Sequence, residues 1–210
     1  MSKISLEPNA SGAGTFTLAA PNSNTNRTLN LPDASGNIIA ADASTGRFDS
    51  SNMPAGSVIQ VVSTTKTDTF SATVSGNFVE ITGLSATITP TSDSSKILIF
   101  VSVTFSETNG NNSLRFRINR DATSIGLPDS AGSRILANFM GFQPSGRKSS
   151  TASYTLLDLP STTASIDYSL LVTNDNTNSE TLFINRAQDD ADNNNRTRTS
   201  STITVMEVAG

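Results

Sequence analysis

The segment KILIFVSVTFS, residues 96–106, decides the fold class of this chain. Its apolar residues recur with a period of two, so one face of the segment carries Ile97, Ile99, Val101, Val103 and Phe105. The opposite face begins apolar, at Leu98 and Phe100, and then becomes polar. This pattern predicts a central β-strand that is buried on one side along its whole length and partly on both sides at its start.

The same alternation appears in SLRFRIN, residues 113–119. Leu114, Phe116 and Ile118 fall on one face, and the two arginines between them fall on the other. We therefore expect a strand with one face against the core and the other against solvent or a partner.

Further short apolar runs complete the pattern, and helical periodicity is nearly absent. The separators between the runs are rich in Gly, Pro, Asn, Asp and Ser, which favour turns. Many short strands with this punctuation predict an all-β chain whose residues 57–210 form a two-sheet jelly-roll β-sandwich. The expected strands lie at residues 57–64, 77–83, 85–90, 134–142, 152–159, 166–174, 180–186 and 202–208.

Residues 1–50 have a different texture, and residues 51–56 read as a linker. Runs such as TFTLAA and RTLNLP are too short and too polar to bury much surface alone. We expect this segment to form a β-stem that intertwines with the same segment of other chains, while residues 56–210 fold without it. A disordered tail is the alternative, although the regular spacing of the apolar residues argues against it.

The composition favours self-association. Hydrophobic residues make up 35% of the 210-residue chain. Counted with glycine and without tyrosine, the apolar share is roughly 40%, against ~45–50% in typical domains. A lean core leaves little apolar area to offset chain entropy, so we expect copies of the chain to complete each other's burial.

The net charge of −4 includes no long basic stretch, which argues against a nucleic-acid partner. The start, MSKISLEPNA, lacks the apolar run of a signal peptide. No segment approaches the ~18 apolar residues of a membrane span, so we expect no membrane insertion and synthesis in the cytosol. The chain has no cysteine and therefore no disulfide.

The residue types that most enzymes use are missing. With no His and no Cys, the usual general base, thiol nucleophile and imidazole ligand are lacking, and we expect no enzymatic activity. No phosphate-binding or dinucleotide motif is present, so we expect no cofactor. The remaining route is a carboxylate pair, and Asp158 and Asp167 flank the LPSTTAS turn. A solvated pair at two strand ends is the other interpretation, and we favour it.

The run NRAQDDADNNNRTRTSS, residues 185–201, is the longest polar connection between two late strands. Its oxygen ligands suit a calcium ion, but their spacing matches no EF-hand, which favours a solvated loop without a metal. Loops at the end of a rigid sandwich often carry binding surfaces. The candidates for such a binding surface are Arg186, Asp189, Asp190, Asp192, Asn193 and Arg196.

Three arginines, Arg115, Arg117 and Arg120, are expected on one strand face. They could dock onto an anionic surface or form a row of ion pairs between subunits. A solvated sheet face is the simpler reading. Tyr154 and Tyr168 share strand faces with apolar residues and are expected in the core.

Several stretches resemble tail-fibre and other virion proteins of tailed bacteriophages, especially phages of cyanobacteria and marine bacteria. They span nearly the whole chain, and together they are more specific than any one alone. The stretches are GTFTLAAPNSNTNRTLNLPDASGNII, MPAGSVIQVV, ITPTSDSSKILIFVSV, YTLLDLPSTTASIDYSLLV and STITVMEVAG.

This resemblance implies a homotrimeric jelly-roll head on a slender N-terminal stem, in a virion assembled inside the infected bacterium. The implied function is that of a tail fibre or fibre tip that binds a glycan or protein of the host surface. The alternative is a trimeric capsid decoration protein. In either case residues 1–50 would attach to other virion proteins, such as the tail hub or the major capsid protein.

Overall fold

The computed structural model describes residues 11–13, 24, 53–108, 112–143, 148–175 and 178–210. The chain divides into two units, Met1–Ile38 and Ile39–Gly210. The predicted stem over residues 1–50 lies outside the described residues except at positions 11–13 and 24. The fold described below therefore concerns residues 53–210.

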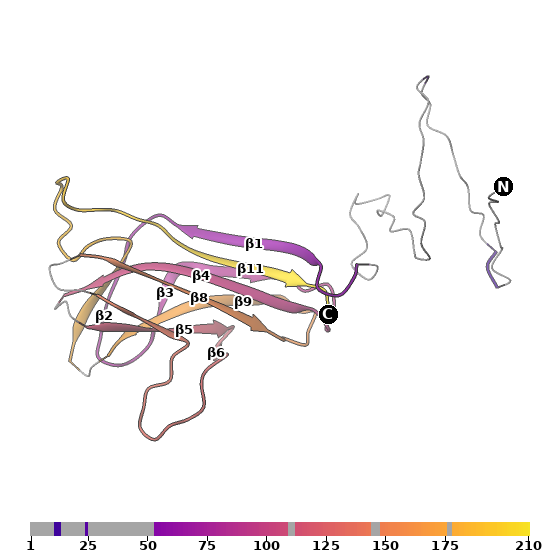
Figure 1. Cartoon of the computed structure of the whole chain (residues 1–210), viewed down its shortest axis with the longest axis horizontal. Helices are drawn as coiled ribbons and strands as arrows, with labels where there is room; N and C mark the ends of the chain where they lie inside the picture. The colour runs from indigo at the N-terminus through magenta and orange to yellow at the C-terminus, as the bar shows by residue number, and fades with distance from the viewer. Residues whose placement is uncertain (1–10, 14–23, 25–52, 109–111, 144–147, 176–177) are drawn as a thin grey trace, which may run out of the picture. The chain divides into compact units, whose positions relative to one another are not determined.

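The described part of this second unit is built of strands and contains no helix (Figure 1). It has eleven strands: β1 (Val58–Lys66), β2 (Phe70–Val74), β3 (Val79–Ile88), β4 (Lys96–Glu107), β5 (Ser113–Arg120), β6 (Thr123–Ser124), β7 (Phe139–Phe142), β8 (Ser150–Asp158), β9 (Ile166–Asn174), β10 (Glu180–Ile184) and β11 (Ser201–Val208).

The first sheet is organised around β4, which is the strand that the segment 96–106 predicts. One edge of β4 pairs with β8. The other edge pairs first with β11 and then, near its end, with β10. Strand β1 lies outside β11, and β2 lies outside β10. All these pairings are antiparallel, so β4 is covered on both edges, as expected of a central strand.

The second sheet has the order β3-β9-β5, with β7 and β6 both pairing with β5. Strand β3 combines two runs that the sequence predicts as separate strands. Its register with β9 shifts between Glu80 and Ser85, and Gly83 there has φ +81°. A bulge with a glycine in the left-handed region lets one strand continue through a bend that breaks the period-two pattern.

The strand pairing defines a jelly roll. Leaving out the short additions β2, β6 and β10, the eight remaining strands pair first with last, second with seventh, third with sixth, and fourth with fifth. These pairs are β1–β11, β3–β9, β4–β8 and β5–β7. Successive pairs fall in alternate sheets. The predicted all-β jelly-roll sandwich is thus confirmed.

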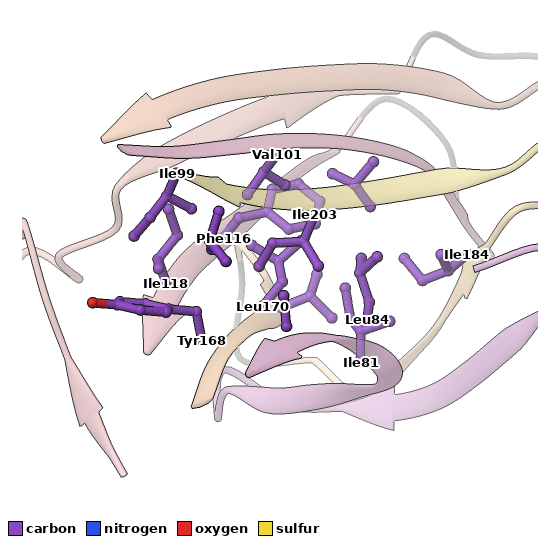
Figure 2. Packing of buried hydrophobic residues seen from close by; sticks show 14 of the residues in the cluster. Ile81, Leu84, Ile99, Val101, Phe116, Ile118, Tyr168, Leu170, Ile184 and Ile203 are labelled. Carbon is purple, nitrogen blue, oxygen red and sulfur yellow. The ribbon is translucent and has the colours of Figure 1, made fainter. Parts of the chain in front are cut away.

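The core lies between the two sheets (Figure 2). The five residues predicted to share the inner face of β4 are all at most 3% exposed. They face Leu114, Phe116 and Ile118 of β5, which are also buried as predicted. An aromatic series crosses the core: Phe116 stacks on Phe139 at 4.9 Å between ring centroids, and Phe139 stacks on Tyr154 at 5.2 Å.

The two ends of the sandwich differ in what they carry. At one end, which we call the terminal end, the chain enters β1 and the C-terminus follows β11. There the amide of Gly56 donates to the carbonyl of Ala209, and the amide of Ala209 donates to Ser57, both at 2.9 Å. The opposite end, which we call the loop end, carries residues 185–200 between β10 and β11 (Figure 1, yellow).

Candidate functional site

The polar connection 185–200 is fixed to the sandwich at its base. The side chain of Asn185 donates to the carbonyls of Lys66 and Asp68 at 2.8 and 2.9 Å and accepts from the hydroxyl of Ser201 at 2.6 Å. Asn185 is 1% exposed and has φ +64°, a conformation that Asn tolerates better than most residues. The loop therefore starts and ends at defined positions on the core.

Within the loop, arginines and aspartates pair with one another. Arg196 contacts Asp189 at 2.8 Å. Asp190 accepts from Arg198 at 2.5 and 2.7 Å and from Arg186 at 3.3 Å. The structure therefore brings together the predicted residues of this segment and adds Arg198, which the sequence reasoning left out of the candidate set.

Arg186 also anchors the loop to the sheet. Its guanidinium lies 4.1 Å from the centroid of the Phe183 ring, and its carbonyl accepts from the hydroxyl of Ser106 at 2.8 Å. The cation–π contact and the pairing with Asp190 use much of this side chain. Arg186 thus has a positioning role at the base of the loop.

A shallow hollow of about 300 Å³ lies in the loop. Its lining combines carboxylate, amide, hydroxyl and guanidinium groups, from Asp190, Ala191, Asp192, Asn193, Arg196, Thr197 and Arg198. Three aspartates and three arginines between positions 186 and 198 leave the segment without net charge. Such a surface can offer both donors and acceptors to a neutral polar ligand, such as a sugar.

The arrangement does not favour calcium. Asp189 and Asp190 are engaged by arginines, whose positive charges compete with a cation for the same oxygens. In the part of the chain that the structure describes, no three His, Cys, Asp or Glu residues are placed to hold a metal ion together.

The prediction that Arg115, Arg117 and Arg120 share one strand face is wrong. Arg120 lies opposite Tyr168, on the same side of β5 as the core residue Ile118. It donates to both oxygens of Asp158, at 3.1 and 3.2 Å, across the edge of the sandwich. Arg120 lies two positions after Ile118, so strand alternation itself assigns it to the inner face.

Arg115 and Arg117 do point outward, but both are held by the backbone. Arg115 donates to the carbonyls of Asn174 and Asp175 at 3.0 and 2.9 Å. Arg117 donates to the carbonyl of Leu136 at 2.8 Å and lies 3.9 Å from the ring centroid of Phe78. Burial lowers the pKa of Arg117 below its usual value. These contacts use guanidinium N–H donors of both arginines, so fewer donors are left to bind an anionic surface.

The carboxylates of Asp158 and Asp167 do not converge. Asp158 lies on the inner side of β8 and accepts from the hydroxyl of Tyr168 at 2.7 Å as well as from Arg120. Asp167 is on the outer side of β9, where it accepts from Thr87 at 2.8 Å. Burial, and then the hydrogen bond to Asp158, raise the pKa of Tyr168. The geometry favours two structural carboxylates over an acid–base pair.

A buried carboxylate at the terminal end escaped the sequence reasoning. Glu207 is 0% exposed and accepts from the hydroxyls of Thr91 and Ser95 and the amide of Thr91, each at 2.7 Å. Gln60 donates to it at 2.5 Å. Burial alone would raise the pKa of Glu207, but the bonds from Ser95, Thr91 and Gln60 prevail and lower it. Glu207 follows Ile203 and Val205 at intervals of two residues, so strand alternation predicts that its side chain points into the core.

A second buried polar group lies near the loop end. Glu107 and Gln143 are 0% exposed and joined by two hydrogen bonds, one of them from the amide of Glu107 to the side chain of Gln143. The side-chain amide of Asn112 donates to the carboxylates of Glu180 at 3.0 Å and Glu107 at 3.4 Å. Glu107 continues the inward series of β4 after Phe105, a signal that the sequence analysis did not use.

Comparison with known proteins identified solved structures only. No family model matches the chain, and no curated protein matches it. No helix among the described residues is long and apolar enough to cross a membrane.

The solved structures that this chain matches include VP2 proteins of infectious bursal disease virus. A mutant VP2 in derived T=1 particles has a TM-score of 0.40 and 15% identity, over 82% of this chain and 41% of the VP2 chain. The Gx strain structure has a TM-score of 0.38 at 15% identity, over 71% and 36%. The VP2 subviral particle has 0.36 at 15%, over 72% and 38%. The chain thus spans less than half of each VP2 chain, and this likeness carries no argument about function.

Proposed function

We propose that this chain is a homotrimeric structural component of a bacteriophage virion, acting as a tail fibre or fibre tip that binds the host cell surface. One observation supports it most directly: the chain enters the sandwich at the terminal end, whereas the loop 185–200 lies at the opposite end. A head attached to the particle through its N-terminal segment would present this loop outward. The resemblance of the sequence motifs to phage fibre proteins supplies the biological context.

The loop would act as the receptor-binding surface. Its hollow offers hydroxyl, amide, carboxylate and guanidinium groups within about 300 Å³, which suits the hydroxyls of a surface glycan. A small polar site of this kind binds weakly by itself. Three copies on one trimer, and several trimers on one particle, would raise the avidity by about 10²–10⁴ when the sites can engage together.

The N-terminal segment, residues 1–50, would hold the head on the particle through another virion protein, the tail hub or the major capsid protein. Capsid decoration is the second form of this proposal. Copy number separates the two, because a decoration protein occupies every repeated capsid position and a fibre only a few positions. Quantitative mass spectrometry of purified virions, relative to the major capsid protein, would assign the chain to one of them.

A binding experiment with two matched variants tests the receptor role. The double variant Asp192→Ala/Asn193→Ala removes exposed polar groups from the loop end, and Asp93→Ala/Ser94→Ala does so at the terminal end. Loss of one or two hydrogen bonds, each about 0.5–1.5 kcal/mol, should weaken binding of labelled protein to host cells roughly tenfold for the loop variant only. Equal binding by wild type and both variants would show that the loop is not the receptor-binding surface. No binding by wild type would show that the protein does not bind the host cell.

A further inference from the structure

The outer face of the first sheet carries an exposed apolar patch. The pairing registers place Val61 of β1 opposite Met206 of β11, Met206 opposite Leu98 of β4, and Leu98 opposite Leu157 of β8. These four residues form a continuous row across the sheet. We call the row and its outward neighbours the outer patch, whose members are Val58, Val61, Leu98, Phe100, Leu157, Leu159, Met206 and Val208.

The outer patch is accessible in the single chain. Val61 is 53% exposed, Leu157 is 47% exposed and Phe100 is 39% exposed. Of the large hydrophobic side chains that are exposed in the described residues, most belong to this patch. A contiguous apolar patch on a sheet face, rather than scattered single residues, is typical of an interaction surface.

The rest of this face carries almost no charge. Beyond the outer patch, the outward positions of β1, β4, β8 and β11 are serines and threonines, with Lys96 at one end of β4. Some hydroxyls already bond to each other: Ser63 to Thr204 at 2.7 Å and Thr104 to Thr151 at 2.9 Å. Pairing within the face lowers the cost of removing water from it.

The outer face of the second sheet is different. It carries charged side chains on each of its three main strands: Glu80 on β3, Asp167 on β9, and Arg115 and Arg117 on β5. Depletion of charge is the compositional mark of the centre of a protein interface. The outer face of the first sheet is depleted of charge in this way, and the outer face of the second sheet is not.

We infer that copies of this chain assemble through the outer face of the β1-β11-β4-β8 sheet, with the outer patch at the centre of the contact. A face with almost no charge does not repel its own copy, and it gives a charged partner nothing to pair with. Four strands about 4.8 Å apart and about eight residues long present a flat area on the order of 500 Å². Each partner of a standard protein–protein interface contributes about 800 Å², so this face can supply most of the area that one partner needs.

This inference rests on the self-association part of the proposed function and is independent of host binding. Residues 1–52 are the alternative segment that would cover the outer patch, because they precede β1, whose first residue, Val58, belongs to the patch. The experiments below separate that outcome from assembly of copies.

The first experiment measures mass in solution for the full chain and two matched variants, by light scattering after size exclusion. Leu157 on β8 and Met140 on β7 are both exposed apolar residues on edge strands, at 47% and 60%, but in opposite sheets. We expect wild type and Met140→Glu to be oligomers and Leu157→Glu to be a monomer. An oligomeric Leu157→Glu, a monomeric wild type, or dissociation by Met140→Glu would overturn the inference.

Circular dichroism establishes that each variant is folded. If Leu157→Glu does not fold, Val61→Thr provides the second test, because threonine keeps the β-branched shape while removing apolar surface. It should raise the concentration at which half of the protein dissociates by roughly tenfold. An unchanged midpoint in a folded Val61→Thr protein would count against the outer patch.

The second experiment identifies what touches the patch. The chain has no cysteine, so Leu157→Cys can carry a single maleimide-benzophenone label, with Met140→Cys as the control. Irradiation of the Leu157→Cys protein should give species of twice the chain mass or more, cross-linked to peptides from residues 53–210. Cross-links to residues 1–52, or products of monomer mass only, would overturn the inference. The host-binding result would still stand by itself.

Discussion

Two carboxylates at opposite ends of the sandwich each accept at least three hydrogen bonds, but from different groups. Glu207, at the terminal end, is 0% exposed and accepts from uncharged donors: Thr91, Ser95 and Gln60. Asp190, at the loop end, is 27% exposed and accepts from Arg186 and Arg198. The same functional group is thus used in a buried network and in a solvated loop.

The difference indicates how each end is stabilised. Buried hydrogen bonds are costly to break, since each donor left without a partner loses about 1–3 kcal/mol. Solvated ion pairs contribute about 0–1 kcal/mol, because water and salt screen them. The terminal end therefore forms a rigid base where the chain enters and leaves. The ion pairs within the loop 185–200, unlike the buried groups at its base, keep a conformation that a ligand could rearrange at small cost.

Substitution of Glu207 by alanine should have the largest effect on stability. It leaves the donors of Thr91, Ser95 and Gln60 without their acceptor inside the protein. We expect a loss of about 3 kcal/mol and a melting temperature lower by roughly 10 °C, measured by differential scanning calorimetry. The control is Glu80→Ala, which removes an exposed carboxylate from β3 and should change stability by less than about 0.5 kcal/mol. Equal shifts for the two variants would show that the network does not stabilise the fold.

The pH dependence of stability should report the same network with a smaller effect. Hydrogen bonds from Ser95, Thr91 and Gln60 outweigh burial and lower the pKa of Glu207 in the folded state. The unfolded chain then binds the proton more readily, so the stabilisation is complete above the unfolded pKa, about 4.3, and is lost as the pH falls through the folded pKa.

Urea unfolding at pH values between about 7 and 3 measures this dependence. Wild type should lose more stability on acidification than Glu207→Gln, whose side chain does not titrate. Parallel curves for the two proteins would mean that Glu207 titrates alike in the folded and unfolded states, contrary to the lowered pKa.

Much of the fold was predictable, because alternation is a strong signal where one face is buried. The apolar inward residues of β4 and β5 were predicted one by one, whereas the inward Glu107 and Arg120 at the ends of these strands were not. The run 134–142 was only partly correct, since the strand is limited to Phe139–Phe142. Before it, the side chain of Asn138 bonds to the amide of Ile118 and the carbonyl of Ile125. Such side-chain bonds replace a strand ladder and leave no period in the sequence.

The candidate sites were less predictable. Composition drew attention to residues 185–201, and the structure does bring their charged groups together. Composition could not indicate which arginine pairs with which aspartate, because those contacts depend on the path of the loop. Strand alternation would have separated Arg120 from Arg117 and would have placed Glu207 beside Val205. The faces of Arg120 and Glu207 could therefore have been predicted by extending the two-residue alternation to the strand ends. Strand β2 was missed for another reason, because five residues are too few to show a clear alternation.

The smallest effect is expected for Asp190→Asn, the counterpart at the loop end of the Glu207 variants. Asparagine keeps an oxygen that can accept from Arg198 and Arg186 but removes the charge, and Arg198 is already 60% exposed. We therefore expect less than about 1 kcal/mol of lost stability, and a difference from wild type that shrinks further as salt rises from about 0.05 to 1 M. Calorimetry at the two salt concentrations measures both quantities, with the exposed Asp93→Asn at the terminal end as control. A loss as large as that of Glu207→Ala would mean that the loop pairs behave as a buried network, and the contrast between the two ends would fail.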